Sequence, residues 1–227
     1  MTRENEMIDI ENKHTIAVFA PHPDDEVLGA GGTIIKKAKN GELVIVCIAT
    51  KGSIFDVRKK EAVEAHKYMG VSESIFLDFP DLGLESVPQE KFTDAIREVL
   101  RTYRPDEVYT SHLGDLHPDH KTLTEAILVS TRPKYDYSPE YVYTYETLSE
   151  TGLNYQDPLN CFNPNVYQDI SLTIEGKIKA LAMHESQMEK YPCGRSQKAI
   201  ESLAAYRGTQ SGFKAAEAFT LIRRYAR

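Results

Sequence analysis

Four short segments with strand signals alternate with four helix-length segments over the first two-thirds of the chain, and this alternation most narrows the possible folds. Strands are predicted at 15–20, 43–50, 74–79 and 106–112, and the second of these is apolar throughout. The segments between and after them predict helices at 27–39, 58–69, 88–103 and 117–130. Strands that alternate with helices favour a parallel sheet joined by right-handed crossovers. The sequence therefore predicts an α/β protein with a Rossmann-like, mostly parallel sheet and helices on both faces.

The pattern changes after residue 132, where the stretch 132–171 holds seven of the 13 tyrosines. One clear strand is expected at 140–146, and helices are expected at about 173–190, at 196–207 and near 213–225. We interpret this region as a decorated C-terminal continuation of one domain that covers residues 1–227. Such tyrosines more often serve packing or a subunit interface than a sugar platform, and we assign them no role.

Charge and apolar patterning exclude several classes of partner. A net charge of −7 without a Lys/Arg block argues against nucleic acid, because a phosphate backbone requires basic patches. The polar first 14 residues do not form a secretory signal, and apolar runs such as 43–49 are too short to span a bilayer. Three widely spaced cysteines form neither a disulfide framework nor a CxxC site. We expect a cytoplasmic protein without a membrane partner.

Two polar motifs follow two of the predicted strands. His22-Pro-Asp24-Asp25-Glu26 comes directly after the first strand, and His117-Pro-Asp119-His120 comes after the fourth. In doubly wound sheets of strand order 3-2-1-4 these strands are neighbours, and ligands bind outside their carboxyl ends. We therefore expect the two motifs to face each other, although they lie about 95 residues apart.

The residue types in these motifs suit metal-assisted hydrolysis. Two imidazoles and one carboxylate form a three-ligand site of the kind found in catalytic zinc centres. A remaining carboxylate can take a proton from water, and a remaining histidine can donate one to an oxyanion or a leaving group. The same ligand set also suits ferrous iron, so an iron-dependent oxygenase stays open at this point.

Structural interpretations of the same residues compete with this one. Asp24 or Asp25 could cap the helix that begins near Val27, although the pairing of two motifs favours the metal site. Glu26 is interpreted as structural, because a glutamate in the first turn is favoured by the helix dipole. The segment 28–34 lacks the third glycine of a dinucleotide loop, so we do not expect NAD.

Together the motifs resemble the LmbE-like (PIG-L) family of zinc-dependent N-acetyl-sugar deacetylases. The segments 50–65 (TKGSIFDVRKKEAVEA), 177–187 (KIKALAMHESQ) and 216–223 (AEAFTLIR) are also similar to that family, so the resemblance runs from about residue 15 to 223. The sequence departs from the usual pattern at Pro21, where alanine is common, and at Lys51, often an arginine. Neither change removes a proposed ligand.

The resemblance implies a role for each residue of the motifs. It makes His22, Asp25 and His120 the ligands of Zn²⁺, with Fe²⁺ or another divalent metal as alternatives. Asp24 becomes the general base on water. His117 would stabilise the oxyanion or protonate the leaving amine.

Three further residues receive roles from the resemblance. The Asp119 carboxylate would orient His117, Arg58 would reach the substrate's hydroxyls or an acidic aglycone, and His184 is a candidate substrate contact. The implied reaction removes the N-acetyl group of a GlcNAc-containing small molecule such as GlcNAc-malate or chitobiose. A homo-oligomer, trimeric or hexameric, is expected. The alternative function is a non-catalytic, metal-containing sugar- or nucleotide-binding module on the same fold.

Overall fold

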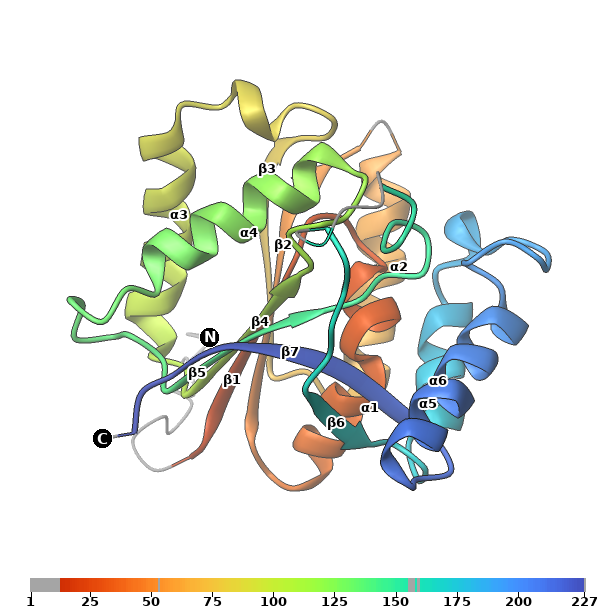
Figure 1. Cartoon of the computed structure of the whole chain (residues 1–227). Helices are drawn as coiled ribbons and strands as arrows, with labels where there is room; N and C mark the ends of the chain where they lie inside the picture. Colours follow the sequence, from red (N-terminus) through yellow and green to blue (C-terminus); the bar gives the residue numbers. More distant parts are fainter. Residues whose placement is uncertain (1–12, 53, 155–157, 159, 227) are drawn as a thin grey trace, which may run out of the picture.

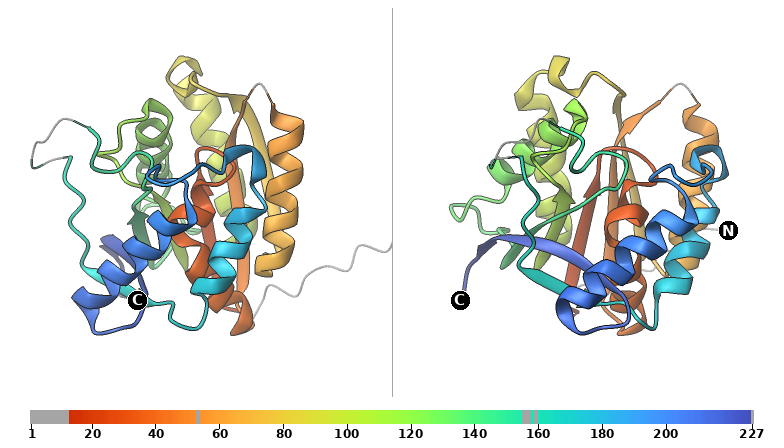
Figure 2. Two further views of the ribbon diagram at one scale, coloured as in Figure 1. Left: turned by 90° about the vertical axis from the view of Figure 1, so that its right-hand side faces the viewer. Right: turned by 45° about the vertical axis from the view of Figure 1, so that its right-hand side comes forward.

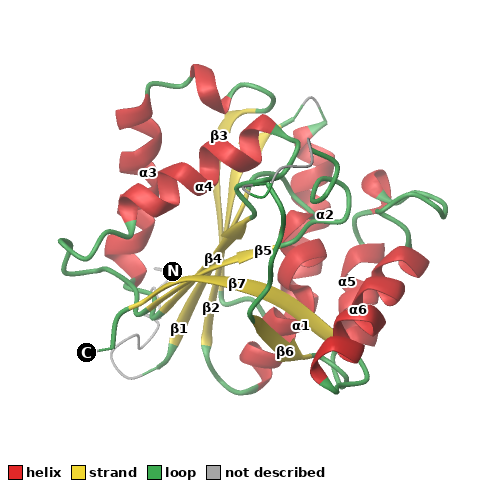
Figure 3. Ribbon diagram, viewed as in Figure 1, coloured by secondary structure: helices red, strands yellow, loops and turns green. Residues whose placement is uncertain are grey.

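A seven-stranded sheet forms the centre of the molecule. The computed structural model describes residues 13–226 except 53, 155–157 and 159. The strands run in the order β3-β2-β1-β4-β5-β7-β6, as Figures 1 and 3 show. Their bounds are β1 Thr15–Ala20, β2 Leu43–Lys51, β3 Glu73–Pro80, β4 Glu107–Ser111, β5 Tyr141–Tyr145, β6 Val166–Asp169 and β7 Ala216–Arg224. The first five strands in this order, from β3 through β2, β1 and β4 to β5, pair in parallel. This confirms the predicted α/β class and the 3-2-1-4 order.

Helices cover both faces of the sheet, as the views in Figure 2 show. One face carries α1 Asp25–Lys39, α2 Phe55–Met69, α5 Ile174–Ala182 and α6 Gln197–Ser211. The other face carries α3 Gln89–Tyr103 and α4 Pro118–Ser130. Two short 3₁₀ turns, η1 Leu84–Ser86 and η2 Glu185–Gln187, lie in the connections.

Strand β1 lies between two hydrophobic cores. Ile16 and Val18 pack into the core under α1 and α5, whereas Ala17 and Phe19 pack into the core under α3 and α4. Both faces of the strand are buried, which explains why its sequence is apolar throughout instead of alternating. The central position of β1 places the segment that follows it at the middle of the sheet edge.

The C-terminal region differs from the sequence expectation. The segment near 213–225 was expected to be a helix but forms β7, which pairs antiparallel with β5 and β6. Its alanines and arginines favour a helix locally, but strand pairing buries Phe219 and outweighs that preference. The helix expected at 173–190 ends at Ala182, and β6 was not anticipated.

Among the described residues, no helix combines the length and the apolar character that crossing a membrane requires. The expectation of no secretory signal rests on the first 14 residues, of which 1–12 lie outside the described part of the chain.

Candidate metal centre

The two motifs meet where β1 and β4 end. These strands pair in parallel, so their carboxyl ends lie at the same sheet edge. The Nδ1 atom of His22 lies 3.0 Å from Oδ2 of Asp25, and Nε2 of His120 lies 3.3 Å from the same oxygen. All three side chains are buried. The structure thus brings together the three residues predicted as metal ligands.

One oxygen of this cluster has no partner. Oδ1 of Asp25 is buried and accepts no hydrogen bond from the described residues. A buried carboxylate oxygen without a partner is costly. Burial would raise the pKa of Asp25, but His120 and His22 hold it well below its usual range. An ionised carboxylate beside two imidazoles fits a divalent cation.

A carboxylate behind His120 fixes the orientation of its ring. Nδ1 of His120 lies 2.8 Å from Oδ2 of Asp115, whose other oxygen accepts the Thr151 hydroxyl at 2.6 Å. Such a partner leaves the opposite ring nitrogen free for a metal. Burial opposes protonation of His120, but Asp25 and Asp115 outweigh it and raise its pKa to about 9. Sequence reasoning missed Asp115, and its place just before the second motif was the available signal.

Two carboxylates approach the outer nitrogen of His22. Nε2 of this ring lies 3.1 Å from Oδ1 of Asp81 and 3.3 Å from Oδ2 of Asp119. Both candidate metal ligands among the histidines therefore have carboxylate partners, as metal-ligating histidines commonly do. Asp81 was also missed, although it directly follows β3, whose carboxyl end lies at the same sheet edge as those of β1 and β4.

The predicted contact between the Asp119 carboxylate and His117 needs correction. The carboxylate accepts the backbone N–H groups of Leu82 at 2.8 Å and Leu84 at 3.1 Å, besides its contact with His22. It is instead the backbone N–H of Asp119 that donates to Nδ1 of His117, at 3.2 Å. Because residue 119 lies in the first turn of α4, its amide points back to the helix start, where His117 is the N-cap.

The surroundings of His117 leave its Nε2–H available to donate a hydrogen bond. Its Nδ1 accepts a hydrogen bond, so the neutral ring carries its proton on Nε2. Burial lowers the pKa of His117, and His22 and His120 lower it further, which favours that neutral form. The His117 ring lies 4.6 Å from the His22 ring between centroids. His117 therefore adjoins the candidate ligands.

Asp24 is buried beside the ligands in an unusual backbone conformation, with φ of 119°. It occupies the N-cap of α1, but its side chain makes no capping hydrogen bond, so the capping interpretation fails for this residue. Its Oδ1 lies 3.2 Å from Nη2 of Arg58, and its Oδ2 lies 3.0 Å from Nε of Arg195. Burial raises the pKa of Asp24 to about 7, with Asp25 adding to the shift and both arginines opposing it. Arg195 was not anticipated from the sequence.

His184 lies behind the first motif. It has no exposed surface, and its Nε2 is 3.6 Å from Oε1 of Glu26, which also meets Nε2 of His66 at 3.2 Å. The side chain has no exposed surface in this structure, as is also true of Asp24, and its role as a substrate contact stays a prediction. Glu26 in turn accepts the backbone N–H of Asp24 at 3.0 Å, consistent with its predicted structural role.

Comparisons with known proteins identify related sequences. The family model PIG-L, described as GlcNAc-PI de-N-acetylase, matches residues 17–130, which include both motifs. A probable N-acetyl-alpha-D-glucosaminyl L-malate deacetylase 2 from Bacillus cereus is 29% identical over 195 residues, which cover 78% of this chain and 84% of that protein. A diacetylchitobiose deacetylase from Thermococcus kodakarensis is 27% identical and covers 91% of this chain, with 82% of its own length matched.

Solved structures share the fold. The N,N'-diacetylchitobiose deacetylase from Pyrococcus horikoshii superposes with a TM-score of 0.73 at 23% identity, and 94% of this chain and 85% of that chain are covered. A conserved protein from Thermus thermophilus has a TM-score of 0.75 at 27% identity, with 93% and 96% covered. The similarity therefore extends over nearly the whole chain, including the C-terminal region.

Proposed function

This chain belongs to the PIG-L family, and we propose that it is a metal-dependent hydrolase that removes the N-acetyl group from a GlcNAc-containing small molecule. The observation that carries this proposal is the cluster of His22, Asp25 and His120, in which one buried carboxylate oxygen has no partner among the described residues. The Asp24 carboxylate and the His117 imidazole, which are not among the proposed ligands, lie beside the cluster. A site that only bound metal would need neither of them.

We propose that His22, Asp25 and His120 hold Zn²⁺, while Fe²⁺ or another divalent metal fits the same donors. Such an ion, when bound, polarises an amide carbonyl and lowers the pKa of water. The Asp115 carboxylate behind His120 supports this assignment, because it holds Nδ1 of that ring and leaves Nε2 facing Asp25.

In this proposal Asp24 accepts the proton of the attacking water while the water oxygen bonds to the amide carbon. The Nε2–H of His117 donates to the carbonyl oxygen as negative charge develops there. The C–N bond then breaks, and the proton held by Asp24 passes to the leaving nitrogen. The immediate products are acetic acid and the free amine, which exchange a proton to give acetate and an ammonium group, so atoms and protons balance.

The substrate class is proposed from the relatives. GlcNAc-malate and chitobiose conjugates are the first candidates, because similar proteins are named for them. Arg58 was expected to reach the substrate, but its Nη2 binds the Asp24 carboxylate and the carbonyl oxygen of Pro23 at 2.9 Å. We therefore propose that the main role of Arg58 is to bind the carboxylate of the general base, and that contact with the sugar is a secondary role.

The test is acetate release from a panel of N-acetylglucosamine conjugates. Asp24→Asn is compared with wild type and with Asp94→Asn, which changes an exposed carboxylate on α3. Each protein is loaded with zinc, and its zinc content is measured. Turnover that falls by about 10³-fold or more in Asp24→Asn alone, at equal zinc content, supports the hydrolase. Zinc binding without turnover of any conjugate by wild type would favour the binding module.

A homo-oligomer, trimeric or hexameric, a single domain over residues 1–227 and a cytoplasmic location stay predictions, as does the absence of a nucleic-acid or membrane partner. Light scattering of the purified protein decides the oligomeric state.

A further inference from the structure

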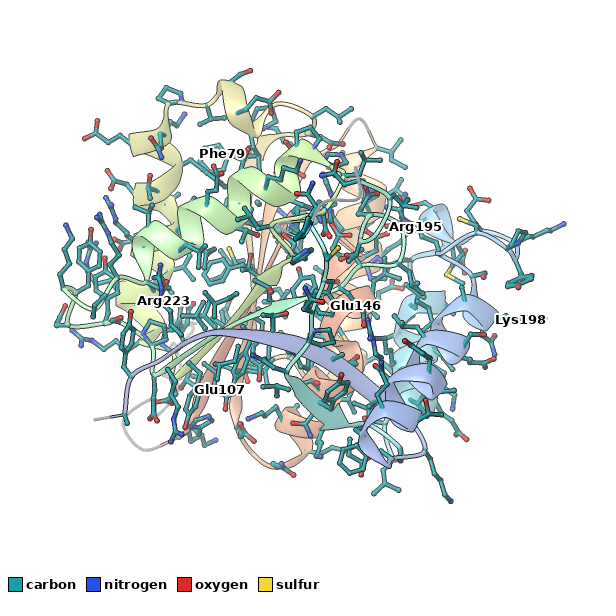
Figure 4. All side chains as sticks on the ribbon, in the orientation of Figure 1. Phe79, Glu107, Glu146, Arg195, Lys198 and Arg223 are labelled. Atoms are coloured by element: carbon teal, nitrogen blue, oxygen red, sulfur yellow. The ribbon has the colours of Figure 1, made fainter. Side chains whose placement is uncertain are left out.

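We propose that Arg195 is a positioning residue of the reaction, which holds the carboxylate of Asp24 in its working orientation. This inference rests on the proposed function, in which Asp24 is the general base. Arg195 lies in the segment 188–196 between η2 and α6, at the end of the sheet opposite Glu107, as Figure 4 shows. It thus belongs to neither motif.

The backbone of Asp24 requires external support. A φ of 119° is rare for a residue with a side chain and costs free energy unless surrounding contacts hold it. The Glu26 carboxylate supports the backbone by accepting the Asp24 N–H. The side chain depends on other contacts, because it makes no capping bond to its own helix.

Two arginines from separate parts of the chain supply those contacts. Arg58, in α2, donates to Oδ1, and Arg195 donates through Nε to Oδ2 at 3.0 Å. Each oxygen therefore has its own charged donor, and rotation of the carboxylate would break both hydrogen bonds. Without Arg195, the carboxylate could turn about its bond to the Cβ atom while keeping one arginine.

The segment that carries Arg195 is itself held in place on both sides. A Cβ atom on Gly194 would lie 2.9 Å from the carbonyl oxygen of Leu148, so the backbone approaches this neighbour as closely as only glycine permits. On the other side, Ser196 caps α6 by accepting the N–H of Ala199 at 3.3 Å. These two contacts fix the backbone from which the Arg195 side chain reaches Asp24.

Arg195 could also be only a counter-ion that stabilises the fold. The side chain is 27% exposed, compared with 11% for Arg58, so its removal leaves a space open to solvent. A small cation can enter such a space and replace the lost guanidinium. Recovery of activity by added guanidinium ion therefore separates positioning from folding.

The first experiment measures kcat and KM for acetate release by zinc-loaded Arg195→Ala and Arg195→Lys. We expect kcat to fall about 10- to 100-fold in Arg195→Ala, with KM and zinc content unchanged. Millimolar guanidinium should restore part of that loss, and Arg195→Lys should lose less. The matched control is Arg207→Ala, which removes an arginine paired with Glu146 at 2.7 and 2.6 Å and should leave kcat unchanged.

A second variant tests whether the backbone at Gly194 places the Arg195 side chain against Asp24. Gly194→Ala should also lower kcat, because the added methyl group displaces the backbone next to Arg195. If Gly194 acts through Arg195, the double variant will be no worse than Arg195→Ala alone. Additive losses, or an Arg195→Ala protein with wild-type kcat or without guanidinium rescue, would overturn the proposal.

A measurement independent of turnover separates this proposal from the proposed function. Crystal structures of zinc-loaded wild type and Arg195→Ala show directly whether the Asp24 carboxylate keeps one orientation. We expect a single rotamer in wild type and a rotated or mixed one in the variant. If no conjugate is hydrolysed by wild type, the proposed function fails, whereas an unchanged Asp24 rotamer in Arg195→Ala refutes the positioning role itself.

Discussion

The ammonium nitrogen of Lys177 lies 2.6 Å from Oε1 of Glu217, and both side chains are buried against the middle of helix α1. Lys177 also donates to the carbonyl oxygen of Leu28 at 2.8 Å, while Glu217 accepts the N–H groups of Gly32 and Thr33. In a regular helix the carbonyl of residue 28 accepts the N–H of residue 32. The pair thus occupies backbone groups of α1 and ties this helix to α5 and β7.

Replacing one member of this pair should destabilise the protein strongly. Glu217→Gln leaves the Lys177 charge buried without its counter-ion, and we expect a loss of about 3–5 kcal/mol in the free energy of unfolding. Urea denaturation measures this loss. Adding Lys177→Met should recover part of it, and the exposed Glu201→Gln serves as the control. A Glu217→Gln protein as stable as this control would contradict the prediction.

Asp115→Asn should weaken metal binding while leaving all three proposed ligands in place. The amide lacks the charge that holds the His120 ring, and changes at such partners commonly reduce metal affinity about 10- to 100-fold. Competition with a chelator measures the zinc affinity. Thr151→Val removes only the hydroxyl that contacts Asp115 and should have a smaller effect. Equal affinities in Asp115→Asn and wild type would show that this contact does not tune the site.

Glu107 should contribute to the pH dependence of stability. Burial would raise the pKa of its carboxyl, but hydrogen bonds from Lys37 and Tyr109 lower it below the usual value. The folded-state pKa is depressed, so the stabilisation is present above the unfolded pKa and is lost as pH falls through the folded pKa. Urea unfolding at about pH 6 and about pH 4 should show a smaller loss for Glu107→Gln than for wild type. Identical losses would argue against this contribution.

Gly29→Ala should disrupt the packing between α1 and β5. A Cβ atom at residue 29 would lie 2.1 Å from Cδ2 of Tyr145, whose ring is fully buried and whose hydroxyl donates to the carbonyl oxygen of Phe19. Overpacking of this kind typically costs about 1–3 kcal/mol or more, measurable as a lower urea midpoint. Gly31→Ala in the same helix meets only side-chain atoms at 3.1 Å or beyond and should be much milder. Similar midpoints for the two variants would contradict the packing argument.

Local patterns were sufficient to predict the centre of the fold and the meeting of the two motifs. The apolar run of β1 predicts that both faces of the strand are buried, and a few consecutive residues are enough for this prediction. In a doubly wound sheet of order 3-2-1-4 the carboxyl ends of β1 and β4 lie together, which brings His22 and His120 into one site. No side-chain detail was needed for that inference.

Only the tertiary structure revealed contacts whose partners are set by packing between distant segments. Strand β7 has helix-forming residues, and its pairing with β5 outweighs them. Arg195 reaches Asp24 from a segment whose backbone packs tightly against Leu148 at Gly194. The Asp119 carboxylate binds the loop after β3 instead of His117. Spacing along the chain determined which side chains lie at the sheet edge, whereas the path of the loops over that edge decided which of them touch.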